Sequence, residues 1–284
     1  MTGRPLAGCI DDGKERPRTL IEPVIHVISG AVLGFLIGLT GVGGGVLTVP
    51  VLILVMRLDP IAAVGTASLF SALTKSHAAW KHYQQRTINV EVGIRFLGPA
   101  LPGVIGASIL VNWARATLSP VEVDALQNTI RYVIILSMGV SLVALLSDFS
   151  RFERRVDVSR LSRTVRIFCV FLLGAVMGAT SIGGGILMIP ALVFFYNETS
   201  KYVGTSILVT VLLMLIICAI YAFLGSQAGV AVVYWQVAGF MALGAAVGTH
   251  YGSGLSRRVD PRLLRLVVGG VILVAVGLMF VEMA

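Results

Sequence analysis

The chain has 284 residues, of which 56% are hydrophobic and 13% are charged, and its formal net charge is +8. With a mean hydropathy of +0.91, this composition excludes an ordinary soluble domain and predicts an integral membrane protein. The positive charge does not indicate a nucleic-acid partner, because the basic residues gather in short loops between apolar runs, as is typical of membrane proteins.

The first 22 residues mix basic and acidic side chains, and the apolar run that follows has no small-residue cleavage site. We therefore predict a retained N-terminal tail at 1–22 and not a signal peptide. The three cysteines, Cys9, Cys169 and Cys218, lack the spacing of a metal site or a disulfide framework. Neither a metal nor a cofactor is expected.

Charge divides the chain into two halves. Apolar runs occupy about residues 23–56, 60–80, 92–113, 126–147, 167–197, 202–224, 230–254 and 263–283. Between the fourth and fifth runs, the stretch 148–166 carries six arginines and three acidic residues, which marks a cytoplasmic linker. We predict a first transmembrane repeat at 23–147, the linker at 148–166 and a second transmembrane repeat at 167–284.

A glycine motif occurs once in each half. Residues 40–50 have the sequence TGVGGGVLTVP, and residues 180–190 have the sequence TSIGGGILMIP. Residues 34–50 and 174–190 are identical at 8 of 17 positions, and Gly65-Thr66 recurs as Gly204-Thr205. This self-similarity predicts two related halves that arose by duplication.

The runs that contain the motif are too long for single straight spans. A helix of 34 residues would extend ~51 Å, whereas the hydrocarbon core is ~30 Å thick. Each run is interrupted by three glycines, whose helix propensity is low. We predict that each run forms two half-helices that meet at a non-helical turn.

Loop charges favour a re-entrant path for these broken runs. The basic regions are 75–95, 148–166 and 256–265. They all reach the cytoplasmic side only if 23–56 and 167–197 return to the side that they entered. The sequence thus predicts an all-α polytopic membrane protein of two inverted repeats, each with a broken, re-entrant glycine-rich helix pair plus about three full transmembrane helices.

The glycine turns are the predicted substrate site. Non-helical backbone at membrane depth must face protein or a watered cavity, and the positive end of the half-helix that starts near Gly45 or Gly185 favours a small anion. The alternatives are a kink or packing role for the glycines and hydroxyls bonded to their own helix carbonyls. The predicted substrate-binding residues are Thr40, Gly41, Gly43, Gly44, Gly45, Thr66, Ser68, Thr180, Ser181, Gly183, Gly184, Gly185, Thr205 and Ser206.

Two other sequence patterns predict close packing of helices and a basic group of side chains. Gly30, Gly34 and Gly38, like Gly174 and Gly178, have the small-xxx-small spacing of close helix packing. Lys75 belongs to a basic group with His77, Lys81 and His82, for which an interfacial patch is the simple interpretation. Helical periodicity also puts Lys75 on the face of Ser68 and Ser71, where it could attract anions on the cytoplasmic side.

These motifs, with GTASL, GTSIL and the run HYQQRTINVEVGIRFLGPALPGVIGASIL, resemble those of the sulfite exporter TauE/SafE family from about residue 24 to 280. The resemblance implies a secondary transporter in the cytoplasmic membrane that exports sulfite, sulfonates or related organic anions, with a proton or sodium ion for coupling. It does not select the anion. Gly41 stands where the second copy has Ser181, which makes the two halves of the site chemically unequal.

Other functions remain as alternatives. The GVGGG segment lacks the lysine and hydroxyl residue of a phosphate-binding loop, so no enzyme is expected. An anion channel is the rival within membrane function, and a non-transporting membrane scaffold or sensor is the rival outside transport. The transport direction, the coupling ion and a homo-oligomeric state stay open.

Overall fold

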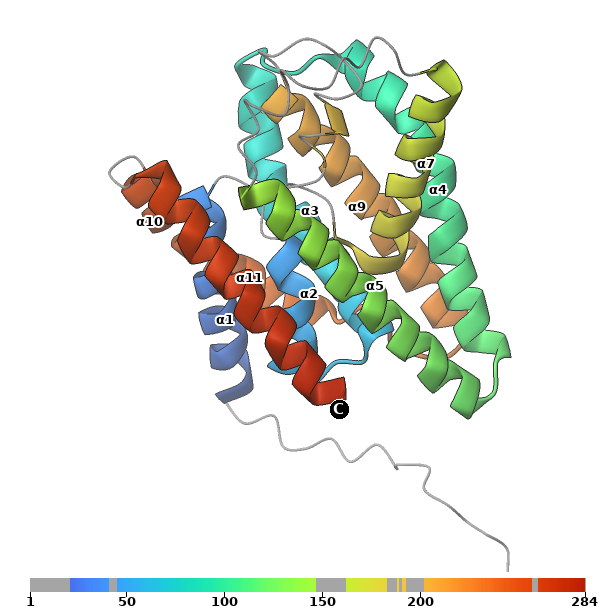
Figure 1. The fold of residues 1–284 in the computed structure, drawn as a ribbon. Helices are drawn as coiled ribbons and strands as arrows, with labels where there is room; N and C mark the ends of the chain where they lie inside the picture. The colour runs from blue at the N-terminus through green and yellow to red at the C-terminus, as the bar shows by residue number, and fades with distance from the viewer. Residues whose placement is uncertain are drawn as a thin grey trace, which may run out of the picture.

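Over the residues that it describes, the computed structural model is all-helical. It describes residues 21–40, 45–146, 162–182, 188, 191–192, 202–256 and 260–283. Within them the helices are α1 (Ile21–Thr40), α2 (Gly45–Leu54), α3 (Pro60–Gln84), α4 (Val90–Thr117), α5 (Pro120–Leu146), α7 (Arg163–Thr180), α9 (Tyr202–Gln227), α10 (Trp235–Ser256) and α11 (Pro261–Met283) (Figure 1). Five of them, α1, α4, α5, α7 and α9, are long and apolar enough to cross a membrane. The chain is thus an all-α polytopic membrane protein.

In each long apolar run, one described helix ends just before the glycines of the motif. α1 ends at Thr40, and α2 begins at Gly45. α7 ends at Thr180, and Ser181 then has a left-handed backbone with φ of 55° while its N–H bonds the carbonyl of Met177 at 2.7 Å. The other predicted glycines, Gly41, Gly43, Gly44, Gly183, Gly184 and Gly185, lie outside the described residues.

Glycines bring α1 and α10 into close contact along one flank of the molecule (Figure 1). A methyl group at any of six glycines would overlap the backbone of the facing helix: Gly30, Gly34 and Gly38 in α1, and Gly244, Gly248 and Gly252 in α10. Gly30 faces Met241, and Gly38 faces Thr249, so the two helices run in the same direction. The predicted packing role of the α1 glycines is confirmed.

The other flank repeats this arrangement with α4 and α7. Gly174 lies against the backbone of Ala100, and Gly178 lies against that of Val104, so these two helices are also parallel. Gly103 of α4 completes the contact against Phe171. The packing role predicted for Gly174 and Gly178 is therefore confirmed as well.

α3 and α9 form the antiparallel centre between the flanks (Figure 1). Gly65, near the start of α3, lies beside Tyr221, near the end of α9. At the opposite end, Thr205 at the start of α9 bonds Asn89, which follows the end of α3. The first half of α3, from Pro60 to Ala72, is buried throughout.

Helices at corresponding places in the two halves of the chain run in opposite directions. α10 begins beside the start of α3, because the N–H of Tyr234 bonds the Thr66 hydroxyl oxygen. α4 begins beside the start of α9 through Asn89 and Thr205. Hence α1, α3 and α10 run one way, and α4, α7 and α9 run the other way. The broken helices α1 and α7 are thus antiparallel, as the predicted inversion requires, while the placement of the repeats in a membrane stays a prediction.

Charges differ between the two ends of the bundle. The end of α3 and the starts of α4, α7 and α9 share one end, which contains much of the predicted cytoplasmic charge. At the other end, Arg57 pairs with Glu282 at 3.2 Å, and Arg115 pairs with Asp59 at 3.5 Å. Because these two arginines have acidic partners, they add little net charge there, which agrees with the predicted orientation.

Candidate functional site

The central helix α3 carries a polar interior into the bundle. Thr66, Ser68 and Ser71 are all buried, and Lys75, at 7% exposure, is the one buried charged side chain in the described part of the chain. His77 and Lys81, by contrast, are exposed. Lys75 is therefore separate from the basic patch around it, and it places a potential cation inside the protein, where such residues usually serve function.

Ser71 adds an unusual hydroxyl on the same face. It is 3% exposed, and its oxygen is fully buried without a hydrogen-bond partner among the described residues. It precedes Lys75 by one helical turn, which brings the two side chains to neighbouring positions. A buried hydroxyl without a partner is unfavourable, so Ser71 is a candidate to bind a ligand or a water molecule.

The two glycine motifs, 140 positions apart in the sequence, meet in space. A β-carbon built on Gly45 would lie 3.7 Å from the carbonyl oxygen of Ser181. Gly45 is the first residue of the ten-residue helix α2, whose N-terminus carries about half a positive charge. The start of α2 thus faces the residue that follows the end of α7.

Thr180 and Ser181 shape the break after α7. The Thr180 hydroxyl donates to the carbonyl of Val176 at 2.7 Å and accepts the N–H of Ile182 at 3.2 Å. The Ser181 hydroxyl donates to the sulfur of Met214 in α9 at 3.3 Å. A thioether is a weak acceptor, so a stronger acceptor such as an oxyanion would compete with it for the Ser181 proton.

The other predicted hydroxyls take part in hydrogen bonds with backbone groups. Thr66 and Thr205 accept backbone N–H groups at opposite ends of the antiparallel pair α3 and α9. Ser68 donates to the carbonyl of Gly65 at 2.6 Å, and Ser206 donates to that of Val203 at 2.8 Å. Bonding of these serines to their own helices corresponds to the alternative considered from the sequence. The side chain of Thr40 lies outside the described residues.

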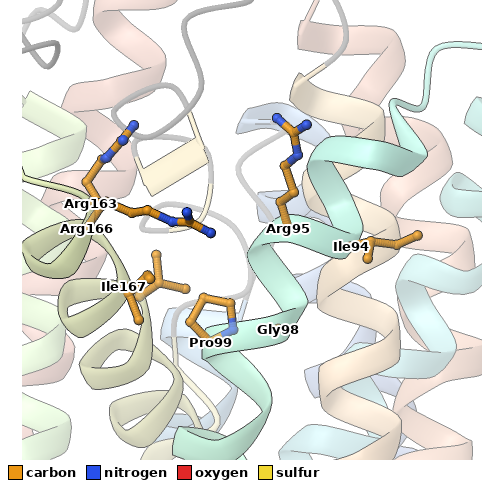
Figure 2. Close-up of a pocket in the computed structure, with 8 residues that line it drawn as sticks. Ile94, Arg95, Gly98, Pro99, Arg163, Arg166 and Ile167 are labelled. Atoms are coloured by element: carbon orange, nitrogen blue, oxygen red, sulfur yellow. The ribbon is translucent and has the colours of Figure 1, made fainter.

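A second polar feature, which the sequence did not indicate, is a cavity of about 620 Å³ between α4 and α7. Figure 2 shows Arg95 on α4 across from Arg163 and Arg166 on α7, with Pro99 and Ile167 below them. The lining consists of Ile94, Arg95, Gly98, Pro99, Arg163, Arg166, Ile167 and Val170. Sequence reasoning used these arginines only as markers of topology, since it did not predict that α4 and α7 lie side by side.

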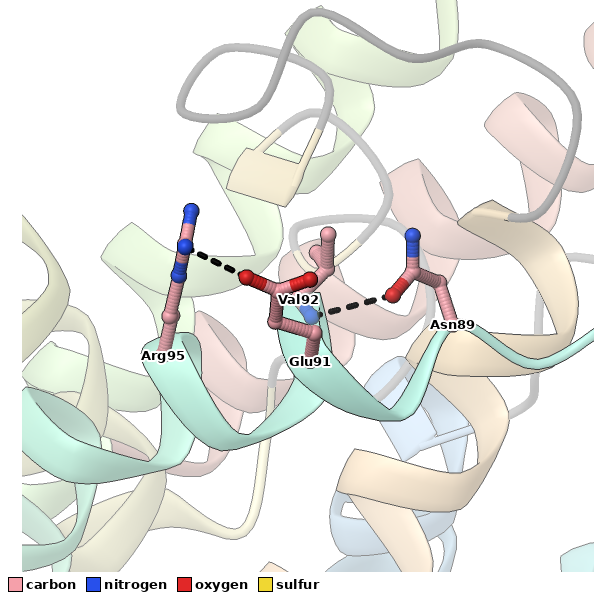
Figure 3. Close-up of polar contacts among 4 residues, drawn as sticks. All are labelled: Asn89, Glu91, Val92 and Arg95. Atoms are coloured by element: carbon pink, nitrogen blue, oxygen red, sulfur yellow. Dashed lines mark hydrogen bonds and ion pairs between the residues drawn. The ribbon is translucent and has the colours of Figure 1, made fainter.

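α7 begins at this cavity with Arg163, and α4 begins one turn before Ile94, its first residue in the lining. At the start of α4, the Asn89 side-chain oxygen accepts the N–H of Val92 at 3.2 Å, and Glu91 pairs with Arg95 on the exposed surface (Figure 3). At the start of α7, the Ser162 hydroxyl accepts the N–H of Thr164 at 3.2 Å. Two parallel helices thus direct their positive ends towards the three arginines, which favours an anion.

The described residues contain no group of three His, Cys, Asp or Glu side chains that could hold a metal ion. The polar features of this region are therefore hydroxyls, backbone amides, one buried lysine and the arginines of the cavity. Such groups can bind and orient a small oxyanion.

Comparison with known proteins gives a consistent result along the chain. The sequence profile described as sulfite exporter TauE/SafE matches residues 26–279. A probable membrane transporter protein of Bacillus subtilis, YjnA, is 31% identical over 256 residues, which cover 88% of this chain and 96% of the relative. A probable membrane transporter protein of Xylella fastidiosa (strain Temecula1) is 27% identical over 270 residues, which cover 92% of this chain and 95% of the relative. No solved structure is significantly similar to the chain.

Proposed function

The chain belongs to the sulfite exporter TauE/SafE family and is a multi-pass membrane transporter, and from this premise we propose that it exports small sulfur-containing anions across the cytoplasmic membrane by secondary transport. The proposed substrates are sulfite, sulfonates and related organic anions. The family description supports this class of substrate and this direction.

The observation that carries the proposal is the approach of Gly45 to Ser181. It joins the positive end of α2 to the break after α7 and to a hydroxyl whose acceptor, among the described residues, is the weak thioether of Met214. A small oxyanion that loses its water needs donors and positive charge in return. The junction of the two motifs offers both, and we place the substrate there.

The internal repeat adds Lys75 to this site. With the spacing that relates Gly65 to Gly204, Lys75 corresponds to Met214. Met214 contacts Ser181 of the second motif. By the same relation, Lys75 would lie beside the first motif, where its ammonium group would attract the anion and the Ser71 hydroxyl would add a donor.

Alternating access requires two parts that move relative to each other. The close glycine contacts join α1 to α10 and α4 to α7. Each contact ties the broken helix of one half to a long helix of the other half. We propose that these two tight pairs move as units about the α3–α9 centre and expose the Gly45–Ser181 junction to one side at a time.

The test is flux through vesicles that contain the purified protein, with sulfite and a simple sulfonate as substrates. We expect saturable flux, competition between the two anions and a strong loss in Gly45→Val, which adds atoms at the junction, where a β-carbon would lie 3.7 Å from the Ser181 carbonyl oxygen. Gly139→Val in α5, where a β-carbon meets no described atom within 4 Å, is the control. Conductance that does not saturate would instead indicate a channel, and absence of flux in the unmodified protein would indicate a scaffold or sensor.

A further inference from the structure

The cavity between α4 and α7 is lined by residues near the start of α7, whereas Ser181 of the Gly45–Ser181 junction follows the end of that helix, and the cavity has its own charge. Arg95, Arg163 and Arg166 line it, and Arg95 is partly offset by Glu91. Neither Arg163 nor Arg166 has an ion-pair partner within the described residues. Since both helix starts also contribute positive charge, the cavity has a net attraction for an anion.

The rest of the lining is apolar. Ile94, Pro99 and Ile167 lie below or beside the arginines (Figure 2), and Val170 also lines the cavity. A free inorganic anion gains nothing from such a floor, whereas a ligand with a charged head and a hydrocarbon tail satisfies both parts. The volume of about 620 Å³ is sufficient for a headgroup and the first part of a chain.

The position of the cavity indicates the source of such a ligand. Arg163 is the first residue of α7, and Arg95 is in the second turn of α4, so the charges lie at the level where the helices leave the membrane. This end is the one that the loop charges assign to the cytoplasm. Ile94, which lines the cavity, and Phe168, which follows Ile167 in α7, are exposed at 63% and 62%, which gives an apolar surface that lipid chains can cover.

We propose that this cavity binds the phosphate group of an anionic phospholipid, with the arginines around the phosphate and the acyl chain over the apolar floor. One guanidinium group can donate two parallel hydrogen bonds to a phosphate group, with a defined geometry. Basic pockets between membrane helices at the cytoplasmic side are well suited to such headgroups. The site is separate from the proposed transport site, and its occupancy can be measured whether or not the protein transports.

The experiment measures retained lipid by native mass spectrometry after exchange into phosphatidylglycerol or phosphatidylcholine. We expect the unmodified protein to retain phosphatidylglycerol in preference to phosphatidylcholine. Arg163→Gln and Arg166→Gln should each weaken this preference about five-fold, from the contribution of a single basic residue near a charged surface. Lys81→Gln removes an exposed charge outside the cavity lining and should leave the preference unchanged.

A second pair of variants tests the cavity itself. Ile167→Trp fills the floor and keeps all three arginines, so it should also reduce lipid retention, while Leu172→Trp enlarges an exposed residue of α7 outside the lining and should not. Equal retention of the two lipids by the unmodified protein would overturn the proposal. So would a loss of lipid retention in the control variants as large as that in the cavity variants. If inorganic phosphate or sulfite displaces the ligand at low concentration, the cavity holds a soluble oxyanion and the lipid assignment is wrong.

Discussion

The hydroxyl oxygen of Thr205 accepts a hydrogen bond from the backbone N–H of Asn89, 2.9 Å away and 116 residues earlier in the chain. Thr66 does the same for the N–H of Tyr234 at 3.1 Å. Asn89 immediately precedes α4, and Tyr234 immediately precedes α10. The Gly-Thr pair of each half therefore holds the residue before a long helix of the other half, while the adjacent glycine lets the two backbones approach.

Thr205→Val removes the acceptor and keeps the shape of the side chain. Because the N–H of Asn89 would lose this partner in a partly buried place, we expect the variant to lose about 1–3 kcal/mol of stability. Thr205→Ser keeps the oxygen and should lose less. Unfolding in detergent, followed by intrinsic fluorescence, measures the difference. Equal stability of the valine and serine variants would show that this bond contributes little.

Lys75→Met should separate stability from transport. The substitution replaces a buried charge with an apolar side chain of similar length, so the protein should be as stable or more stable. If Lys75 attracts the anion, the apparent affinity should fall roughly ten- to a hundred-fold, the range for a hydrogen bond to a charged group.

The matched control is Lys81→Met, which removes a charge from an exposed position of the same helix. Sulfite flux into vesicles, measured across a range of concentrations, gives both affinity and maximal rate. Unchanged affinity in Lys75→Met would remove Lys75 from the substrate site and leave it a structural role.

Local patterns predicted the features that depend on neighbouring residues in the chain. The end of α7 at Thr180 and the packing role of Gly34 follow from run length and from glycine spacing, which are visible in one segment at a time. The antiparallel directions of α1 and α7 agree with the topology that loop charges indicated.

Features that depend on which helices become neighbours could not be predicted. The glycines of α10 have the same spacing as those of α1, yet only the structure shows that the two sets face each other. The arginine cavity needs α4 beside α7, a pairing across 70 residues that no local pattern encodes. Thr66 and Thr205 have suitable chemistry for an anion, but their place at opposite ends of α3 and α9 became visible only in three dimensions.

Gly34→Ala tests the contact between α1 and α10. The added methyl group would overlap the backbone at Ala245, so the helices must separate and lose packing. We expect a loss of about 1–3 kcal/mol, as for overpacking of a dense contact. Gly139→Ala, where a β-carbon meets nothing within 4 Å, should instead gain up to about 1 kcal/mol from helix propensity. Opposite shifts of the melting temperature are the expected result, and equal shifts would contradict the close contact.

Ser181 offers the sharpest test of how the break after α7 serves the site. Its φ of 55° is unfavourable for a residue with a β-carbon, and β-branching increases the strain. Ser181→Gly should therefore stabilise the protein by about 1 kcal/mol, whereas Ser181→Val should destabilise it by about as much or more.

Glycine is also the residue at the corresponding position of the first motif, so Ser181→Gly makes the two motifs chemically alike at this point. If the hydroxyl binds the anion, this more stable variant should have a several-fold weaker affinity for sulfite. Full affinity in Ser181→Gly would leave the backbone at the Gly45 junction, and not the Ser181 side chain, as the group that recognises the anion.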